Sequence, residues 1–229
     1  MTTRAFTSEE IAALDLALAG LGRHRDRLLL LLLVATGYRI TEILTVRVGQ
    51  LVHPDGTIAG EMSIARRLLK CGRSKRAKSI RSRRVPLSGM ARTAISDYIS
   101  TIDEMPPATA FVFQSRKGVN SPISRGQAYK IVKSIARMVG LDADRLGCHS
   151  TRKAYAGGLY EATGHDIIKT QRLLGHASPL TTARYIDTDA TELDNLVREF
   201  NPLAKAREFV AALQFPKTTL AAEPESRRV

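Results

Sequence analysis

One stretch, residues 148–185, carries histidine, arginine and tyrosine side chains at spacings that suit reaction at a phosphate. His149 and Arg152 lie three positions apart, so on a helix both would share one face. His176 follows a Leu-Leu-Gly turn, and Tyr185 lies nine residues beyond it. A guanidinium binds phosphate oxygens in pairs, a histidine transfers protons near neutral pH, and an ionised phenol is a nucleophile. Each residue alone also fits an ordinary surface helix or cap, so their joint placement carries the prediction.

A second group lies far upstream, where Arg39 and Glu42 are three positions apart after a leucine-rich run. Arg39 and Arg152 would clamp the non-bridging oxygens of a phosphodiester and stabilise the charge that attack builds there. Glu42 would hold Arg39, or a nearby hairpin, through hydrogen bonds. A phenol has a reference pKa of about 10, so it needs a base or a strongly positive field to ionise. The arginines and histidines would supply that field.

Together these motifs resemble the catalytic signature of the tyrosine recombinase (phage integrase) family. The resemblance covers about residues 6–190 and rests on Thr36-Gly37-Tyr38-Arg39 with Glu42, His149-x-x-Arg152, Leu-Gly-His176 and Tyr185. It implies a mainly α fold with a small antiparallel β-sheet (α+β). It further implies that Tyr185 forms a 3′-phosphotyrosyl link to DNA, that Arg39, His149, Arg152 and His176 are also catalytic, and that neither a cofactor nor a metal is needed.

Most of the net charge of +13 comes from residues 66–84, which hold ten Lys and Arg and no acid. Such a run is either a solvated basic loop or a DNA-contacting hairpin. The family resemblance implies a hairpin whose lysine protonates the leaving 5′-oxygen. Lys78, seven residues before Val85-Pro86-Leu87, fits best, with Lys75 and Lys70 as competitors. The predicted DNA-binding residues are Arg66, Arg67, Lys75, Arg83 and Arg84, and then Arg125, Lys130 and Lys133 on an exposed helix face.

Caps and apolar periodicity predict the elements that must position these side chains. Helices are expected over residues 8–19, 25–36, 40–46, 89–102, 125–139, 149–162 and 166–174, and from Thr181 through Tyr185. Strands are expected on both sides of a turn at 53–56, in a segment that ends in residues 84–87, and at 111–113. The apolar helix 25–36 should be central, with Gly37 as its C-cap. Thr151 stands where the family usually has an apolar residue.

Three regions are predicted along the chain: a catalytic domain over 1–190, a helical extension over 191–214 and a disordered tail over 215–229. The extension has apolar faces that would pack on the chain's own domain or on a neighbouring protomer. Because the catalytic pattern starts within about ten residues of Met1, we expect a minimal recombinase without the additional N-terminal DNA-clamping domain of most family members.

The cysteine pattern and the hydrophobic runs indicate the cellular compartment in which the protein works. The two cysteines form no C-x-x-C motif or Cys/His cluster, so neither a disulfide framework nor a structural zinc site is indicated. The leucine run at 28–34 is too short to span a bilayer. We therefore expect a cytoplasmic, nucleoid-associated protein. The expected partner is double-stranded DNA, bound by a homotetramer on paired sites, with an accessory DNA-bending protein as a further candidate.

Two functions from different classes remain open, and a relaxing enzyme similar to a type IB topoisomerase would share the same site. The first is a site-specific recombinase that performs integration, excision or inversion. The alternative is a non-catalytic, sequence-specific DNA-binding regulator or accessory protein on the same fold. The joint presence of Arg39, Arg152, His176 and Tyr185 favours the enzyme, because a binding protein has no need of a phenol and two arginines converging on one phosphate.

Overall fold

The computed structural model describes residues 3–65, 68, 82–176, 178–186 and 198. It divides the chain into two units, residues 1–187 and 188–229. Of the second unit only Arg198 is described, so the predicted helical extension and tail lie outside the described residues. The same holds for Arg66, Arg67, Lys70, Lys75 and Lys78 of the basic segment.

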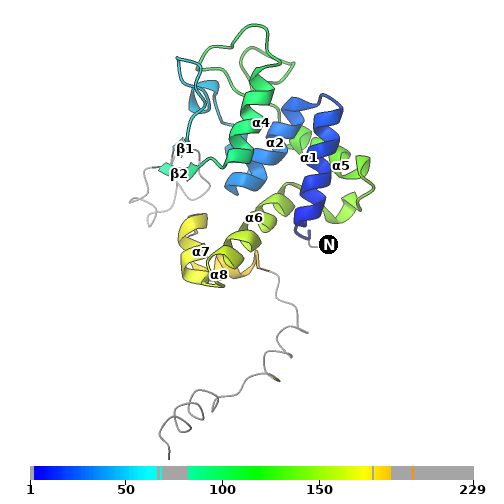
Figure 1. Cartoon of the computed structure of the whole chain (residues 1–229), viewed down its shortest axis with the longest axis vertical. Helices are drawn as coiled ribbons and strands as arrows, with labels where there is room; N and C mark the ends of the chain where they lie inside the picture. Colours follow the sequence, from blue (N-terminus) through cyan, green and yellow to red (C-terminus); the bar gives the residue numbers. More distant parts are fainter. Residues whose placement is uncertain (1–2, 66–67, 69–81, 177, 187–197, 199–229) are drawn as a thin grey trace, which may run out of the picture. The chain divides into compact units, whose positions relative to one another are not determined.

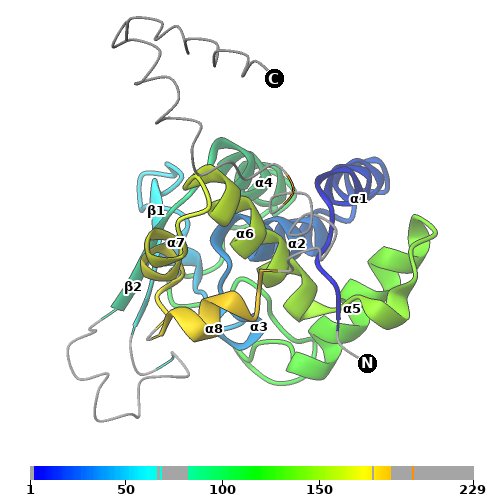
Figure 2. The same cartoon turned by 90° about the horizontal axis from the view of Figure 1, so that it is seen from below.

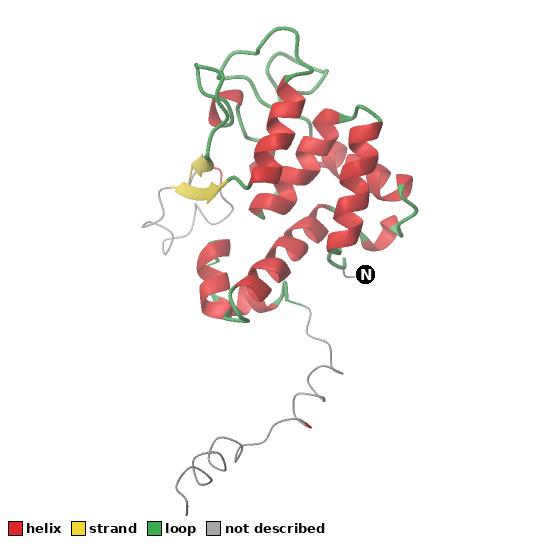
Figure 3. Cartoon of the chain, viewed as in Figure 1, coloured by secondary structure: helices red, strands yellow, loops and turns green. Residues whose placement is uncertain are grey.

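The first unit is mainly helical (Figure 3). Its α-helices are α1 Ser8–Gly20, α2 His24–Thr36, α3 Ile40–Ile43, α4 Gly89–Ile99, α5 Arg125–Met138, α6 Cys148–Ala162, α7 Ile167–Leu174 and α8 Pro179–Ala183. Capping side chains fix several of these starts. Thr7 accepts a hydrogen bond from the Glu10 backbone while the Glu10 carboxylate accepts one from Thr7, and Ser124 and Asp166 cap α5 and α7.

Helix α2 forms the centre of the core, as its continuous leucine run predicts. Residues 28–33 are at most 1% exposed, and the helix packs against α1, α4 and α6 (Figures 1 and 2). A helix that is apolar all round must be covered on every side. The end of α2 is thereby held at a fixed place inside the unit, and the candidate site is built on that end.

The sheet has two described strands, β1 Glu61–Ala65 and β2 Ser82–Pro86, paired antiparallel with Ile64 opposite Arg83. The other predicted strands are wrong for the described residues. Val52 and Ile58 form a single bridge around the turn, and Phe111 forms one with Arg47. Segment 110–112 is tied to residues 46–48 by backbone hydrogen bonds, and the Arg47 guanidinium covers the Phe111 ring at 4.2 Å. These contacts hold the segment without a ladder.

The last described helix also differs from the prediction. It begins at Pro179 after the N-cap Ser178 and ends at Ala183, so Tyr185 lies beyond it, in a turn closed by the Tyr185 amide and the Thr182 carbonyl at 2.8 Å. Proline favours the first helical position, which explains the earlier start. Within the described ranges, no helix has both the length and the apolar character needed to cross a membrane.

Candidate active site

The C-terminal end of α2 gathers two of the arginines. Gly37 caps the helix in the left-handed conformation, with φ of 56°. The Thr36 carbonyl accepts a hydrogen bond from Arg83 Nη2 at 3.0 Å, and the Gly37 carbonyl accepts one from Arg152 Nη1. Carbonyls of a last turn lack partners within their helix and form the negative end of its dipole. This end of α2 therefore favours cations and fixes where the two guanidinium groups lie.

Arg152 is 1% exposed, and its second nitrogen, Nη2, lies 2.6 Å from His176 Nε2. A guanidinium only donates hydrogen bonds, so His176 Nε2 must be the acceptor. Its Nδ1 then carries the proton and donates to Thr182 Oγ1 at 3.0 Å. Burial, and then the positive charges of Arg152, Arg39 and Arg83, lower the pKa of His176 to about 4. His176 is therefore neutral at physiological pH.

Tyr185 joins this pair through its ring. The ring centroid lies 5.4 Å from that of His176, and Arg152 Cζ lies 5.5 Å from it. The left-handed Gly175, with φ of 65°, ends α7 and turns the chain so that His176 is buried. The structure thus brings together three of the predicted residues: Arg152 from α6, His176 from the turn after α7 and Tyr185 from the turn after α8.

Arg39 is oriented by Glu42. The Glu42 carboxylate is 1% exposed; Oε1 accepts from Arg39 Nη1 at 3.0 Å and Oε2 accepts from the Arg39 amide at 2.8 Å. The Arg39 side chain keeps 21% of its surface exposed. Burial lowers the pKa of Arg152, and the charges of Arg39 and Arg83 lower it further. The site therefore concentrates positive charge in a partly water-excluded place, which suits an anionic group that needs several donors.

Two donors of this cluster remain available in the described part of the chain. Arg152 Nε and Arg83 Nε are buried, and neither makes a hydrogen bond there. Most buried donors in folded proteins have a partner, so such atoms call for an explanation. A phosphate oxygen would be a matching acceptor for the Arg152 Nε.

The other predicted residues take different places. His149, near the start of α6, is exposed, and Thr151 is buried with its hydroxyl bonded to the Cys148 carbonyl at 2.9 Å, which lets it pack as an apolar residue would. Arg125 and Lys130 are exposed on α5. Lys133 is not, contrary to the prediction: its side chain is 12% exposed and pairs with Asp144 at 3.3 Å. That partner comes from another element, which helical periodicity does not reveal.

Sequence reasoning missed three groups that build the site. Thr182 holds the Nδ1 side of His176, the Gly37 carbonyl holds Arg152, and the Tyr38 hydroxyl donates to the Arg83 carbonyl. Burial raises the pKa of Tyr38 to about 12, so this hydroxyl keeps its proton. In the sequence, Tyr38 stands between Gly37 and Arg39, a setting that gives no local signal of burial.

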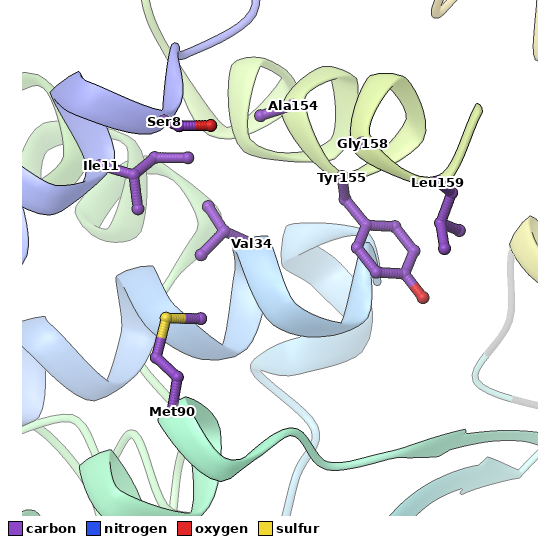
Figure 4. Close-up of a pocket in the computed structure, with 8 residues that line it drawn as sticks. All are labelled: Ser8, Ile11, Val34, Met90, Ala154, Tyr155, Gly158 and Leu159. Carbon is purple, nitrogen blue, oxygen red and sulfur yellow. The ribbon is translucent and has the colours of Figure 1, made fainter. Parts of the chain in front are cut away.

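We expect Gly37→Ala to destabilise the fold. An added Cβ would lie 2.0 Å from Cδ1 of Tyr155, which extends from α6 toward α2 at one edge of a cleft of about 370 Å³ between α1, α2, α4 and α6 (Figure 4). The left-handed backbone and the displaced ring together should cost about 2–4 kcal/mol. Urea unfolding measures this cost. The matched control is Gly22→Ala, with φ of 64° and open space around an added Cβ, which should cost only about 1–2 kcal/mol. Equal costs would contradict the predicted clash.

We expect a pH-dependent contribution of His176 to stability. The unfolded histidine titrates near 6.5 and the folded one at about 4, so the unfolded chain binds the extra proton between these values. The contribution is complete above about pH 6.5 and is lost as the pH falls toward 4. The difference in unfolding free energy between wild type and His176→Gln should shrink over that window, because the glutamine does not titrate. A difference that is constant from pH 7 to 4.5 would show that His176 does not have this low pKa.

Comparison with known sequences decides the family. The family model described as the phage integrase family matches residues 5–192. The chain belongs to the phage integrase family. Among its members, this chain is 32% identical over 175 residues to tyrosine recombinase XerC of Erythrobacter litoralis, covering 76% of this chain and 49% of the relative. It is 29% identical over 165 residues to the probable integrase/recombinase YoeC of Bacillus subtilis, covering 72% and 78%.

Solved structures share the fold of this chain. The crystal structure of XerA recombinase aligns with a TM-score of 0.65 at 18% identity, over 88% of this chain and 65% of that one. XerH bound to palindromic difH substrate aligns with a TM-score of 0.64 at 24% identity, over 85% and 52%. At these identities the likeness shows the fold alone. The chain spans about half the length of XerC of Erythrobacter litoralis.

Proposed function

We propose that this chain is a site-specific DNA recombinase that cuts and rejoins strands through a 3′-phosphotyrosyl intermediate. The observation that carries the proposal is the direct contact of Arg152 with His176 and with the Tyr185 ring. Arg39 adds to the same positive field. The relatives named as tyrosine recombinases support it. A regulator that only binds DNA has no use for a buried guanidinium beside a phenol.

In the proposed reaction the Tyr185 oxygen attacks a backbone phosphorus. One P–O bond forms to the phenol oxygen, the bond to the 5′-oxygen breaks, the phenol gives up a proton, and the leaving oxygen takes one. Arg39 and Arg152 would stabilise the charge on the non-bridging oxygens. Attack by another 5′-hydroxyl reverses each step. One ester replaces another, so the backbone bond energy is kept and no cofactor is consumed.

Further roles are proposals of the same kind. Lys78 would protonate the leaving 5′-oxygen, and His149, exposed near the start of α6, would hydrogen-bond a phosphate oxygen or move a proton. The exposed cations Arg84, Arg125 and Lys130 would contact the backbone of double-stranded DNA. A homotetramer on paired sites, with or without an accessory DNA-bending protein, would complete an exchange of strands.

Covalent capture tests the proposal directly. The full chain is incubated with duplex DNA whose sequence is randomised around a nick, so that the short cleaved piece diffuses away and religation fails. Denaturing electrophoresis should then show a protein-DNA adduct that survives detergent and heat and is digested by protease. Mass spectrometry should place the nucleotide on Tyr185, and sequencing the captured DNA should give a preferred site. Specific binding without any adduct would favour the non-catalytic regulator.

A further inference from the structure

Strand β2 presents two neighbouring arginines to opposite sides. Along the strand, Arg83 and Val85 point inward, whereas Arg84 points outward, is 67% exposed and pairs with Glu61 of β1. The sequence offered both arginines as DNA contacts. Their surroundings differ so much that one role cannot fit both.

Arg83 contacts the end of α2 on two sides. Its Nη2 donates to the Thr36 carbonyl at 3.0 Å, and its Cζ lies 4.4 Å from the centroid of the Tyr38 ring. In addition, the Tyr38 hydroxyl donates a hydrogen bond to the Arg83 carbonyl. Tyr38 immediately precedes Arg39, and the Thr36 carbonyl is adjacent to the one that holds Arg152.

A third contact reaches the turn before His176. A Cβ on Gly175 would lie 3.3 Å from Arg83 Cδ, so the stem of Arg83 packs against the left-handed residue that turns His176 inward. β2 and α7 lie side by side in both views of the unit (Figures 1 and 2). Arg83 therefore touches the segments that carry Arg39 and His176, and the helix end that anchors Arg152.

The cost of this placement argues against simple packing. Burial is the largest effect and lowers the pKa of Arg83; the Glu42 carboxylate raises it and Arg39 lowers it, and the net shift is downward, so a charge is kept here against desolvation and repulsion. A methionine would fill the same space without either cost, but it would offer no donor to the Thr36 carbonyl and no cation to the Tyr38 ring.

We propose that Arg83 is a positioning residue, which holds the Tyr38–Arg39 segment and the turn before His176 in register so that Arg39, Arg152 and His176 meet one phosphate. This inference rests on the proposed recombinase function. It assigns to Arg84, and not to Arg83, the contact with the DNA backbone.

The test compares Arg83→Gln and Arg83→Lys with the neighbouring Arg84→Gln and with a matched control, Arg92→Gln, at an exposed arginine on α4, all in the full chain. At saturating DNA, Arg83→Gln should form the covalent adduct about a hundredfold more slowly than wild type, because small displacements at a reacting centre cost that much. Its DNA affinity should stay within about threefold of wild type, since no phosphate contact is lost. Arg92→Gln should cleave at the wild-type rate, whereas Arg84→Gln should bind DNA more weakly, with its slope of log affinity against log salt reduced by about 0.9.

A second readout does not depend on activity. The groups that face His176 are Arg152, Arg39, Arg83, Thr182 and the Tyr185 ring. In an NMR titration of the free protein, the His176 midpoint should rise in Arg83→Gln, remain near the wild-type value in Arg83→Lys, which keeps the charge, and be unchanged in Arg84→Gln. Arg83→Lys should still cleave slowly, because an ammonium lacks the planar fork.

The outcomes separate the inference from the function on which it rests. Wild-type cleavage rates in both Arg83 variants, or equal losses of rate in Arg83→Gln and Arg92→Gln, would overturn the positioning role. If Arg83→Gln does not fold, the rate and affinity of Arg83→Lys decide in the same way. Absence of any adduct from wild type would overturn the recombinase function instead. In that case the His176 titration alone tests whether Arg83 holds the turn before His176, and an unchanged midpoint in Arg83→Gln would reject that contact.

Discussion

Tyr185→Phe is expected to abolish covalent attachment to DNA while leaving DNA binding intact. The change removes one oxygen and no charge, and the ring that lies beside His176 and Arg152 stays in place. Without the phenol oxygen there is no atom to form the bond to phosphorus, so the loss should be complete and not merely large. Denaturing gels on the captured target site measure the adduct, and fluorescence anisotropy measures binding.

The matched control is Tyr160→Phe on α6, whose ring packs against His165 at 5.0 Å. It should attach to DNA at the wild-type rate. An adduct that persists in Tyr185→Phe would reject Tyr185 as the nucleophile and would require another residue in its place.

Arg152→Gln should slow adduct formation by about 10²–10³-fold, which is the usual cost of removing one fixed donor from a charged transition state. The guanidinium is buried between the Gly37 carbonyl and His176, which fix the positions of its donors. Arg152→Lys should recover little of the rate, because an ammonium cannot meet two phosphate oxygens in one plane. Single-turnover cleavage at saturating DNA gives the rates, and urea unfolding shows whether the variants remain folded.

Arg172→Gln supplies the comparison for Arg152, since Arg172 is exposed on α7 and carries the same charge. It should leave the single-turnover rate unchanged. A rate for Arg152→Gln within a few-fold of wild type would remove the arginine clamp from the mechanism.

Local signals in the sequence predicted most helices because each signal acts within one turn. The Thr7–Glu10 capping box, Ser124, Asp166 and the left-handed Gly37 all lie where their residue types place them. The same kind of signal, Ser178 followed by Pro179, would have given the correct start of the last helix. Its end, and the turn that carries Tyr185, depend on the hydrogen bond from the Tyr185 amide to Thr182.

What the sequence did not predict depends on contacts between distant segments. Nothing in a run of basic residues separates Arg83 from Arg84 until strand alternation and the pairing with β1 are known. The same is true of the ion pair between Lys133 and Asp144 and of the hydrogen bond from Arg152 to the Gly37 carbonyl. Each joins two elements that no local sequence rule connects. The types of the site residues were readable from the sequence, but the backbone and hydroxyl groups that hold them were not.

The contact between Arg152 and the Gly37 carbonyl spans 115 positions of the chain, and Arg83 reaches Thr36 across 47. Contacts of such long range form late in folding, because a large loop must close before they yield any stabilisation. In a growing or partly unfolded chain, Arg152 is therefore not yet in place beside Arg39. If the chain cuts DNA as proposed, the ability to cut appears only with the completed fold, and incomplete or clipped copies would be harmless to the DNA around them.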